Sequence, residues 1–112
     1  MNGVAFCESF DEVARRAHEI ALEHGWWEED RGDAVSVALM HGELSEALEY
    51  MRSDPDEPSD HIPAFTGVEE ELADVIIRIM DTAQRRGYDV GGALVAKVEY
   101  NAGRPYKHGK RF

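Results

Sequence analysis

The stretch that decides the fold runs from Val68 to Arg86 and reads VEEELADVIIRIMDTAQRR. Its large apolar side chains recur every three or four residues, which is the spacing of one face of an α-helix. They are Leu72, Val75, Ile76, Ile79 and Met80. Thr66 and Glu69 have the spacing of a capping box at the start of this stretch, and Gly87 follows its end. The sequence therefore predicts a helix from about Val68 to Arg86 with one apolar face to bury.

Other stretches of the chain show the same helical periodicity, and none has the alternation of a convincing β-strand. The further predicted helices run from about Ser9 to His24, from Asp33 to about Arg52, and from about Val90 to Ala102. A chain of 112 residues is one domain by length, and alone it buries only about two thirds of its unfolded surface. We therefore predict an all-α fold with a single domain over residues 1–112. We expect an antiparallel bundle of about four helices, completed by oligomerisation.

Capping residues mark the ends of these helices. Ser9 and Glu12 form a predicted capping box for the first helix, and Asp33 and Asp89 are the predicted N-caps of the second and fourth. Between the second and third helices, the segment Ser53–Gly67 holds Pro residues that cannot continue a helix. A loop of this length is long for so small a domain and is usually functional or mobile.

The composition excludes several classes of partner. The net charge of −11 argues against nucleic acid, because phosphate contacts need surplus lysine and arginine. The charge is uneven, since the stretch from Lys97 to the C-terminus is basic and holds a single acid, Glu99. Cys7 is the only cysteine, so no disulfide forms within the chain. No apolar run is long enough for a membrane span, and the segment Met1–Phe10 does not look like a signal peptide. We therefore expect a cytoplasmic protein without a membrane partner.

Acidic residues occupy matching positions on the second and third predicted helices. Glu43 and Glu46 lie three residues apart, as do Glu71 and Asp74. Residues three apart share one face of a helix, so each pair can direct its carboxylates at one point. Two such helices side by side would gather carboxylate oxygens, which are the ligands that magnesium prefers. The spacing therefore predicts a magnesium site, with manganese as a substitute ion.

An acidic helix face is more often simply solvated, and the apolar pattern helps to decide. On the second helix, Glu43 and Glu46 interrupt an apolar surface, where a buried charge is costly unless a cation compensates it. On the third helix, Glu71 borders the apolar face. Asp74 lies further round, where helical spacing alone predicts a solvent-exposed residue in a salt bridge. For Asp74, therefore, only its pairing with Glu71 favours a functional role.

The acids, their spacing and the basic tail together resemble the MazG-type all-α nucleotide pyrophosphohydrolases, close to the short single-domain members. The pattern of that family is a Glu-Glu-x-x-Glu segment followed, after a gap, by Glu-x-x-Asp. Here Glu43 and Glu46 match the first part, and Glu71 and Asp74 match the second. The matching tail residues are Lys97, Asn101, Arg104, Tyr106 and Lys107. The resemblance covers the chain from about Gly25 to its end.

This resemblance implies a magnesium-dependent enzyme that cleaves a nucleoside triphosphate into a monophosphate and pyrophosphate. It also implies a homodimer or homotetramer with the site near a subunit interface. The acids of the pattern would be the metal ligands. Lys97, Asn101 and Arg104 would contact the triphosphate, with Tyr106 and Lys107 beside them. The alternative for Lys97 and Arg104 is an ordinary favourable charge near a helix C-terminus.

One position departs from the family pattern. Gly42 stands where relatives have the first acid of the Glu-Glu pair, which is a candidate for activating the attacking water. The catalytic role would then pass to Glu43 and Glu46, with a water that magnesium and a ligand carboxylate activate. His41 is a second candidate base, although a lone histidine is more often polar surface.

Two neighbouring tryptophans, Trp26 and Trp27, stand between the first two predicted helices. One of them can fill the core beneath the loop. The functional interpretation is that one stacks on a nucleobase, because an aromatic face stacks on any base. The sequence does not choose between the two residues.

Other functions remain open on the sequence alone. A phosphoribosyl-ATP pyrophosphatase would keep the family and change the substrate. A non-catalytic acidic dimerisation or adaptor module would use the segment Asp54–Asp60 as a binding surface and would not respond to magnesium. An acidic DNA mimic would bind a basic partner, but the basic tail argues against this reading.

Overall fold

The fold is given by a computed structural model that describes residues 1–111. Its helices are α1 (Gly3–Glu23), α2 (Asp33–Ser53), α3 (Gly67–Arg86), α4 (Val90–Ala102) and the short 3-10 helix η1 (Tyr106–Gly109). Over the described residues, the β structure is limited to an isolated bridge between Pro58 and Thr66. The predicted all-α class is therefore confirmed.

The first helix begins earlier than its sequence indicated. Asn2 is the N-cap of α1, and its side chain accepts a hydrogen bond of 3.0 Å from the backbone N–H of Ala5. Ser9 and Glu12 therefore lie inside the helix, and the prediction that they cap it was wrong. Asparagine is as good an N-cap as serine, so the earlier start satisfies the free N–H groups equally well.

The other helix ends follow the predicted residues more closely. Thr66 and Glu69 form a capping box at the start of α3, and Gly87 ends α3 in the left-handed conformation, with φ 74°. Asp89 caps α4 by accepting a hydrogen bond from the N–H of Gly92. Asp33, however, is the first residue of α2 and not its cap, because the cap position is occupied by a glycine without a side chain.

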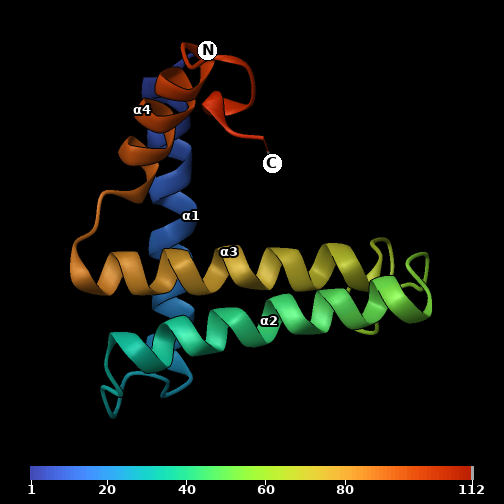
Figure 1. Ribbon diagram of the computed structural model, residues 1–112. Coiled ribbons are helices and arrows are strands. Elements are labelled where there is room, and N and C mark those ends of the chain that lie inside the picture. Colours follow the sequence, from blue (N-terminus) through green and yellow to red (C-terminus); the bar gives the residue numbers. More distant parts are fainter. Residues whose placement is uncertain (112) are drawn as a thin grey trace.

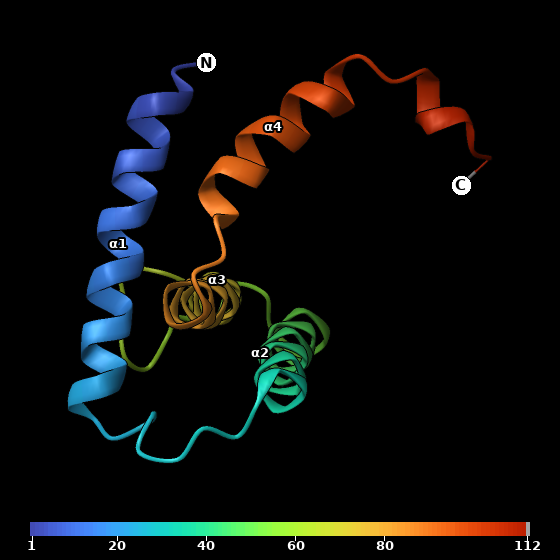
Figure 2. The same ribbon diagram turned by 90° about the vertical axis from the view of Figure 1, so that its left-hand side faces the viewer.

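Helices α2 and α3 lie side by side and run in opposite directions, joined by the long loop between them (Figure 1). A glycine allows their close approach at one end, because a Cβ on Gly67 would overlap the ring of Tyr50. Helix α1 crosses α3 steeply, and α4 turns back along α1 and extends away from α2 (Figure 2). The chain is therefore an α2–α3 pair resting on α1, with α4 projecting from it.

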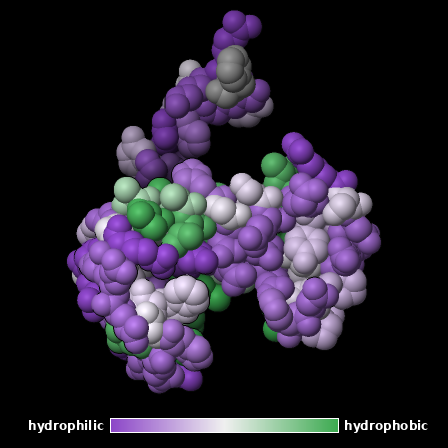
Figure 3. All heavy atoms as spheres, turned by 90° about the horizontal axis from the view of Figure 1, so that it is seen from below, coloured by the Kyte–Doolittle hydropathy of each residue, from purple (hydrophilic) through white to green (hydrophobic). Residues whose placement is uncertain are grey.

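Small side chains make up most of the core. The buried apolar residues are Ala14, Ala21, Ala47, Met80 and Ala83. Alanine at a helix contact lets two backbones come close but buries little apolar area. Many larger apolar side chains stay exposed, and some gather in a patch among hydrophilic ones on the face seen in Figure 3.

The chain is less compact than a monomer of its size. Its radius of gyration is 16.3 Å, whereas a compact chain of about 100 residues has a value of about 13 Å. Its accessible surface is 8241 Å², whereas a compact monomer of 12.6 kDa exposes about 6200 Å². Among the described helices, none combines the length and apolar character that crossing a membrane requires. The single chain thus leaves apolar surface uncovered.

Candidate metal centre

Helices α2 and α3 bring three of the predicted acids together. Oxygen atoms of Glu43, Glu46 and Glu71, one from each carboxylate, all lie within 4.8 Å of one another. Glu43 and Glu46 share a face of α2 because they are three residues apart, and Glu71 faces them from α3. We call these three residues the acidic triad.

Glu71 is the innermost member of the acidic triad. Its Oε2 atom is buried, and no hydrogen-bond partner for it is found among residues 1–111. Burial, together with the neighbouring Glu43 and Glu46 carboxyls, raises the pKa of Glu71 to about 8. An unpaired buried acceptor beside two other carboxylates is costly, and a cation relieves both the desolvation and the repulsion. The donor set, all carboxylate oxygen, suits a hard ion such as magnesium.

Glu43 is held in its charged form by an arginine of α3. Arg78 Nε donates a hydrogen bond of 2.7 Å to Glu43 Oε1. The side chain of Glu43 is 13% exposed and that of Arg78 is 40% exposed. Burial acts to raise the pKa of Glu43, but the hydrogen bond and charge of Arg78, together with the neighbouring triad carboxyls, bring it below its usual value.

Asp74, the fourth predicted ligand, lies beside the acidic triad and outside it. It is half-buried and lines the same cavity as Glu43, so it is not the solvent-exposed residue that helical spacing alone predicted. Burial and then the negative charge of Glu43 raise its pKa. No ion pair of Asp74 is found within the described chain, because Arg78, one turn further along α3, bonds to Glu43 instead.

Two cavities flank the acids. The larger, of about 370 Å³, lies between α1, α2 and α3. Its lining includes Trp26, Trp27, Glu43, Asp74 and Arg78. The smaller, of about 290 Å³, is lined by Glu46, Glu49, Tyr50, Ser53 and Glu71. The acidic triad therefore faces both hollows, and the larger one has a volume in the range of small-molecule sites.

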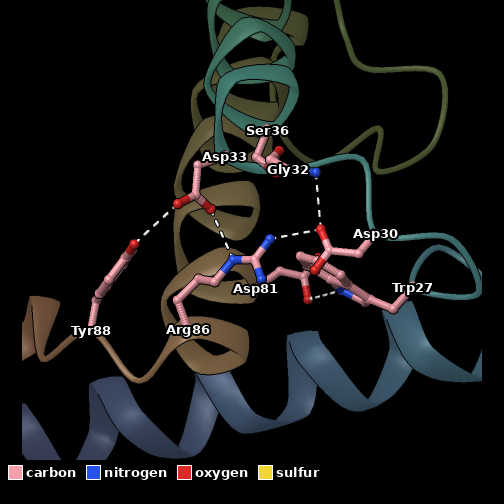
Figure 4. Close-up of polar contacts among 8 residues, drawn as sticks. All are labelled: Trp27, Asp30, Gly32, Asp33, Ser36, Asp81, Arg86 and Tyr88. Carbon is pink, nitrogen blue, oxygen red and sulfur yellow. Dashed lines mark hydrogen bonds and ion pairs between the residues drawn. The ribbon is translucent and has the colours of Figure 1, made fainter.

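The two tryptophans differ in how tightly they are held. Trp27 Nε1 donates a hydrogen bond of 2.9 Å to Asp81 Oδ1 (Figure 4). The guanidinium of Arg85 lies 5.1 Å from the ring centre of Trp27. Trp26 is 63% exposed and also lines the larger cavity. Trp27 is therefore part of the cavity wall, whereas Trp26 keeps a free aromatic face.

An ion-pair network that the sequence did not reveal ties the loop before α2 to the end of α3. Arg86 Nη2 donates to Asp30 at 2.7 Å, and its Nε donates to Asp33 at 2.8 Å (Figure 4). Tyr88 Oη donates to the other oxygen of Asp33 at 3.2 Å. The hydrogen bond from Arg86 is the main cause that lowers the pKa of Asp30. An acidic helix start opposite a basic helix end was a usable signal, because antiparallel neighbours place those ends together.

A second unforeseen cluster fastens the long loop onto α3. Ser59, which is buried, donates a hydrogen bond of 2.5 Å to Glu70 Oε1. His61 Nδ1 lies 2.7 Å from Glu70 Oε2. The hydrogen bond with Glu70 raises the pKa of His61, and the bonds from Ser59 and then His61 lower the pKa of Glu70. We call these three residues the loop clamp; one of them, Glu70, directly precedes Glu71 in the sequence.

The predicted substrate-binding tail lies elsewhere in this chain. The amino group of Lys97 is 4.6 Å and the guanidinium of Arg104 is 5.6 Å from the ring centre of Tyr100. Asn101 is in the last turn of α4, and Tyr106 and Lys107 begin η1 beyond it. In Figure 1, α4 and the tail lie above α3, whereas α2 lies below it. One chain therefore does not bring these residues to the acidic triad.

The remaining predicted catalytic position, His41, is exposed on α2, and no hydrogen bond of its side chain is found among residues 1–111. Its neighbour Gly42 is also exposed, and a Cβ there would meet open space. The position that holds an acid in the resembled family is therefore free to accept a side chain.

Comparison of the chain with protein-family models, with curated proteins and with solved structures finds no significant match.

Proposed function

We propose that the protein is a magnesium-dependent nucleoside triphosphate pyrophosphohydrolase that converts a nucleoside triphosphate and water to a monophosphate and pyrophosphate. The observation that carries the proposal is the acidic triad, in which Oε2 of Glu71 is buried and has no hydrogen-bond partner among residues 1–111. The adjoining cavity of about 370 Å³ adds support, since it offers room for a nucleoside beside the acids.

In this proposal the acids hold the metal, and the cavity holds the nucleoside. When bound, magnesium neutralises the triphosphate and stabilises the charge that builds on the leaving pyrophosphate. Glu43 is positioned by burial and by Arg78, and Glu71 by burial, while Asp74 adds negative charge at the cavity side. Glu46 is the exposed member of the acidic triad, so its carboxylate is accessible to accept a proton from water.

Trp26 is the candidate for stacking on the base. It is exposed and lines the cavity, whereas the ring of Trp27 already has Arg85 and Arg86 against it. A flat aromatic surface binds bases without choosing strongly among them. Discrimination between nucleotides then belongs to hydrogen bonds at the base edge.

We also propose that the working unit is an oligomer, a homodimer or a homotetramer. Helix α2 has an apolar stripe of Leu44, Leu48 and Met51, all of which are exposed in the single chain. The excess accessible surface of one chain over a compact monomer is about 2000 Å², more than the roughly 800 Å² that each partner buries in a standard interface. A second copy could also supply the Lys97–Lys107 region that one chain keeps away from its own acids.

The test is to incubate the pure protein and magnesium with each common nucleoside triphosphate, its deoxy form and phosphoribosyl-ATP, and to resolve the products by ³¹P NMR. Monophosphate and pyrophosphate are the expected products. Orthophosphate and a diphosphate would contradict the proposal. Hydrolysis of phosphoribosyl-ATP alone would reassign the substrate.

Two variants connect the products to the site. Glu46→Ala and Asp74→Ala should each abolish turnover and leave the helix content unchanged, because both residues are exposed or half-buried and support no helix contact of the core. Release of pyrophosphate at the parent rate by Glu46→Ala would contradict the mechanism. A melting temperature that ignores magnesium, together with no turnover, would favour the adaptor function.

A further inference from the structure

Arg78 has an unusual position among the basic residues of the chain. Its Nε is bonded to Glu43 at 2.7 Å, and the side chain lines the larger cavity next to Asp74. Over residues 1–111, this is the single ion pair found to any of the four predicted metal ligands. A positive charge thus lies at the border between the acidic triad and the space proposed for the substrate.

Most of the donor capacity of Arg78 is unused. A guanidinium carries five N–H donors, and only Nε has a hydrogen-bond acceptor among the described residues. The two Nη atoms have no acceptor in that part of the chain, and the side chain is 40% exposed. A fork of free N–H groups matches the oxygens of a phosphate better than any other side chain does.

The position of Arg78 also fills a gap in the site. A polyphosphate bound through magnesium still carries negative charge, and the predicted phosphate ligands Lys97 and Arg104 pack on Tyr100 away from the triad in the same chain. The cavity that adjoins the acids needs a donor of its own. Glu43 holds the Arg78 side chain in place, so phosphate binding does not carry the entropic cost of ordering that side chain.

We propose that Arg78 is a polyphosphate-binding residue of this site, with Nε held by Glu43 and the two Nη atoms donating to phosphate oxygens in the cavity. This proposal rests on the proposed function, because it takes the acidic triad as the metal site. It adds a phosphate ligand from the same chain and the same helix as Glu71.

The geometry predicts that removing the charge of Arg78 has opposite effects on the binding of metal and on the binding of phosphate. A divalent ion at the acidic triad is repelled by the positive charge of Arg78, so removing that charge should strengthen metal binding. A polyphosphate is attracted by the same charge and bonded by its N–H groups, so removal should weaken its binding. A residue with a merely structural role would weaken both together.

The experiment compares Arg78→Gln and Arg78→Lys with the parent protein. Manganese affinity without nucleotide is measured by electron paramagnetic resonance, and affinity for inorganic tripolyphosphate with magnesium by calorimetry. For Arg78→Gln we expect manganese to bind about threefold tighter and tripolyphosphate about tenfold weaker. Arg78→Lys should regain part of the tripolyphosphate affinity, because lysine keeps the positive charge but lacks the forked N–H donors of the guanidinium.

The matched control is Arg16→Gln, which removes an exposed arginine paired with Glu19 on α1, away from the acids. It should leave both affinities at the parent values. If Arg78→Gln behaves like this control, or if it weakens both ligands in proportion to a fall in melting temperature, the proposal is overturned. Arg78→Lys keeps the test valid if the glutamine variant folds poorly.

Failure of this proposal is distinguishable from failure of the proposed function. If the parent protein releases pyrophosphate and Arg78→Gln does so with unchanged affinity for tripolyphosphate, the function stands and the role of Arg78 is wrong. If the parent releases no pyrophosphate from any nucleotide while Arg78→Gln shows the opposite shifts, Arg78 binds polyphosphate at a site that does not hydrolyse it.

Discussion

Glu71 is the residue of the acidic triad whose ionisation is most unfavourable in the folded chain. Its pKa is about 8 in the metal-free chain, raised by burial and by Glu43 and Glu46. A carboxyl whose pKa rises on folding binds its proton more tightly in the native state. The native state is therefore penalised as the pH rises from about 4.5, the value in the unfolded chain, through about 8.

We predict that Glu71→Gln stabilises the metal-free protein. At pH 8 the free energy of unfolding should rise by about 1–3 kcal/mol, because the amide removes the penalty for ionising a buried acid. At pH 4.5 the gain should be small, since the parent carboxyl is then largely protonated. Urea titrations at both pH values in EDTA measure the difference. An equal or larger gain at pH 4.5 would show that packing, and not charge, is responsible.

The loop clamp should give the fold a pH dependence of a different shape. His61 has a raised pKa, so its contribution is complete below its unfolded value near 6.5 and is lost as the pH rises through the folded value. Glu70 has a lowered pKa, so its contribution is present above its unfolded value near 4.5 and is lost as the pH falls through the folded value. Both groups are charged between these two values.

We therefore predict that His61→Gln lowers the melting temperature most between about pH 5 and pH 6.5 and much less at pH 9. Thermal melts of both proteins across this range measure the effect. His41→Gln is the matched control, because His41 is exposed and makes no described hydrogen bond. A uniform loss at every pH would assign the effect to packing of the ring.

At the scale of helices, two glycines allow a direct comparison. Gly42 lies inside α2, and a Cβ there meets open space, whereas a Cβ on Gly67 would overlap the ring of Tyr50. Glycine inside a helix costs up to about 1 kcal/mol relative to alanine. Where the new methyl has no room, overpacking outweighs this gain.

Gly42→Ala should therefore raise the free energy of unfolding by about 0.5–1 kcal/mol. Gly67→Ala should lower it by about 1–3 kcal/mol, because the Tyr50 ring has to move. Chemical denaturation of the two variants in parallel gives both values. Equal changes in the two variants would mean that the α2–α3 contact is looser than the structure has it.

The sequence carried most of the information about these elements. Helical periodicity, the Thr66–Glu69 box and the stop at Gly87 predicted the ends of α3 within a residue. The start of α1 was missed because Asn2 and Ser9 are equally good caps, and local sequence does not rank them. The pairing of Glu43 with Arg78 was missed for another reason: it joins two helices, and spacing within one helix says nothing about it.

At the scale of the whole molecule, the uncovered apolar surface indicates association. The stripe formed by Leu44, Leu48 and Met51 follows one side of α2 and is exposed in the single chain. We predict a dimer or tetramer in sedimentation, and predict that Leu48→Lys shifts it toward the monomer, because a charge on the stripe would be buried without a partner.

The control for this shift is Glu8→Gln, which changes the net charge by the same amount at an exposed polar position of α1. It should leave the assembly unchanged. An oligomer that survives Leu48→Lys would place the interface on another face of the chain.

The central claim is that Glu43, Glu46 and Glu71 hold a divalent cation. Anomalous diffraction from crystals grown with manganese tests it directly. We expect a peak at about 2.0–2.3 Å from an oxygen of each of the three carboxylates. A saturating manganese concentration that leaves the acidic triad without a peak would contradict the account.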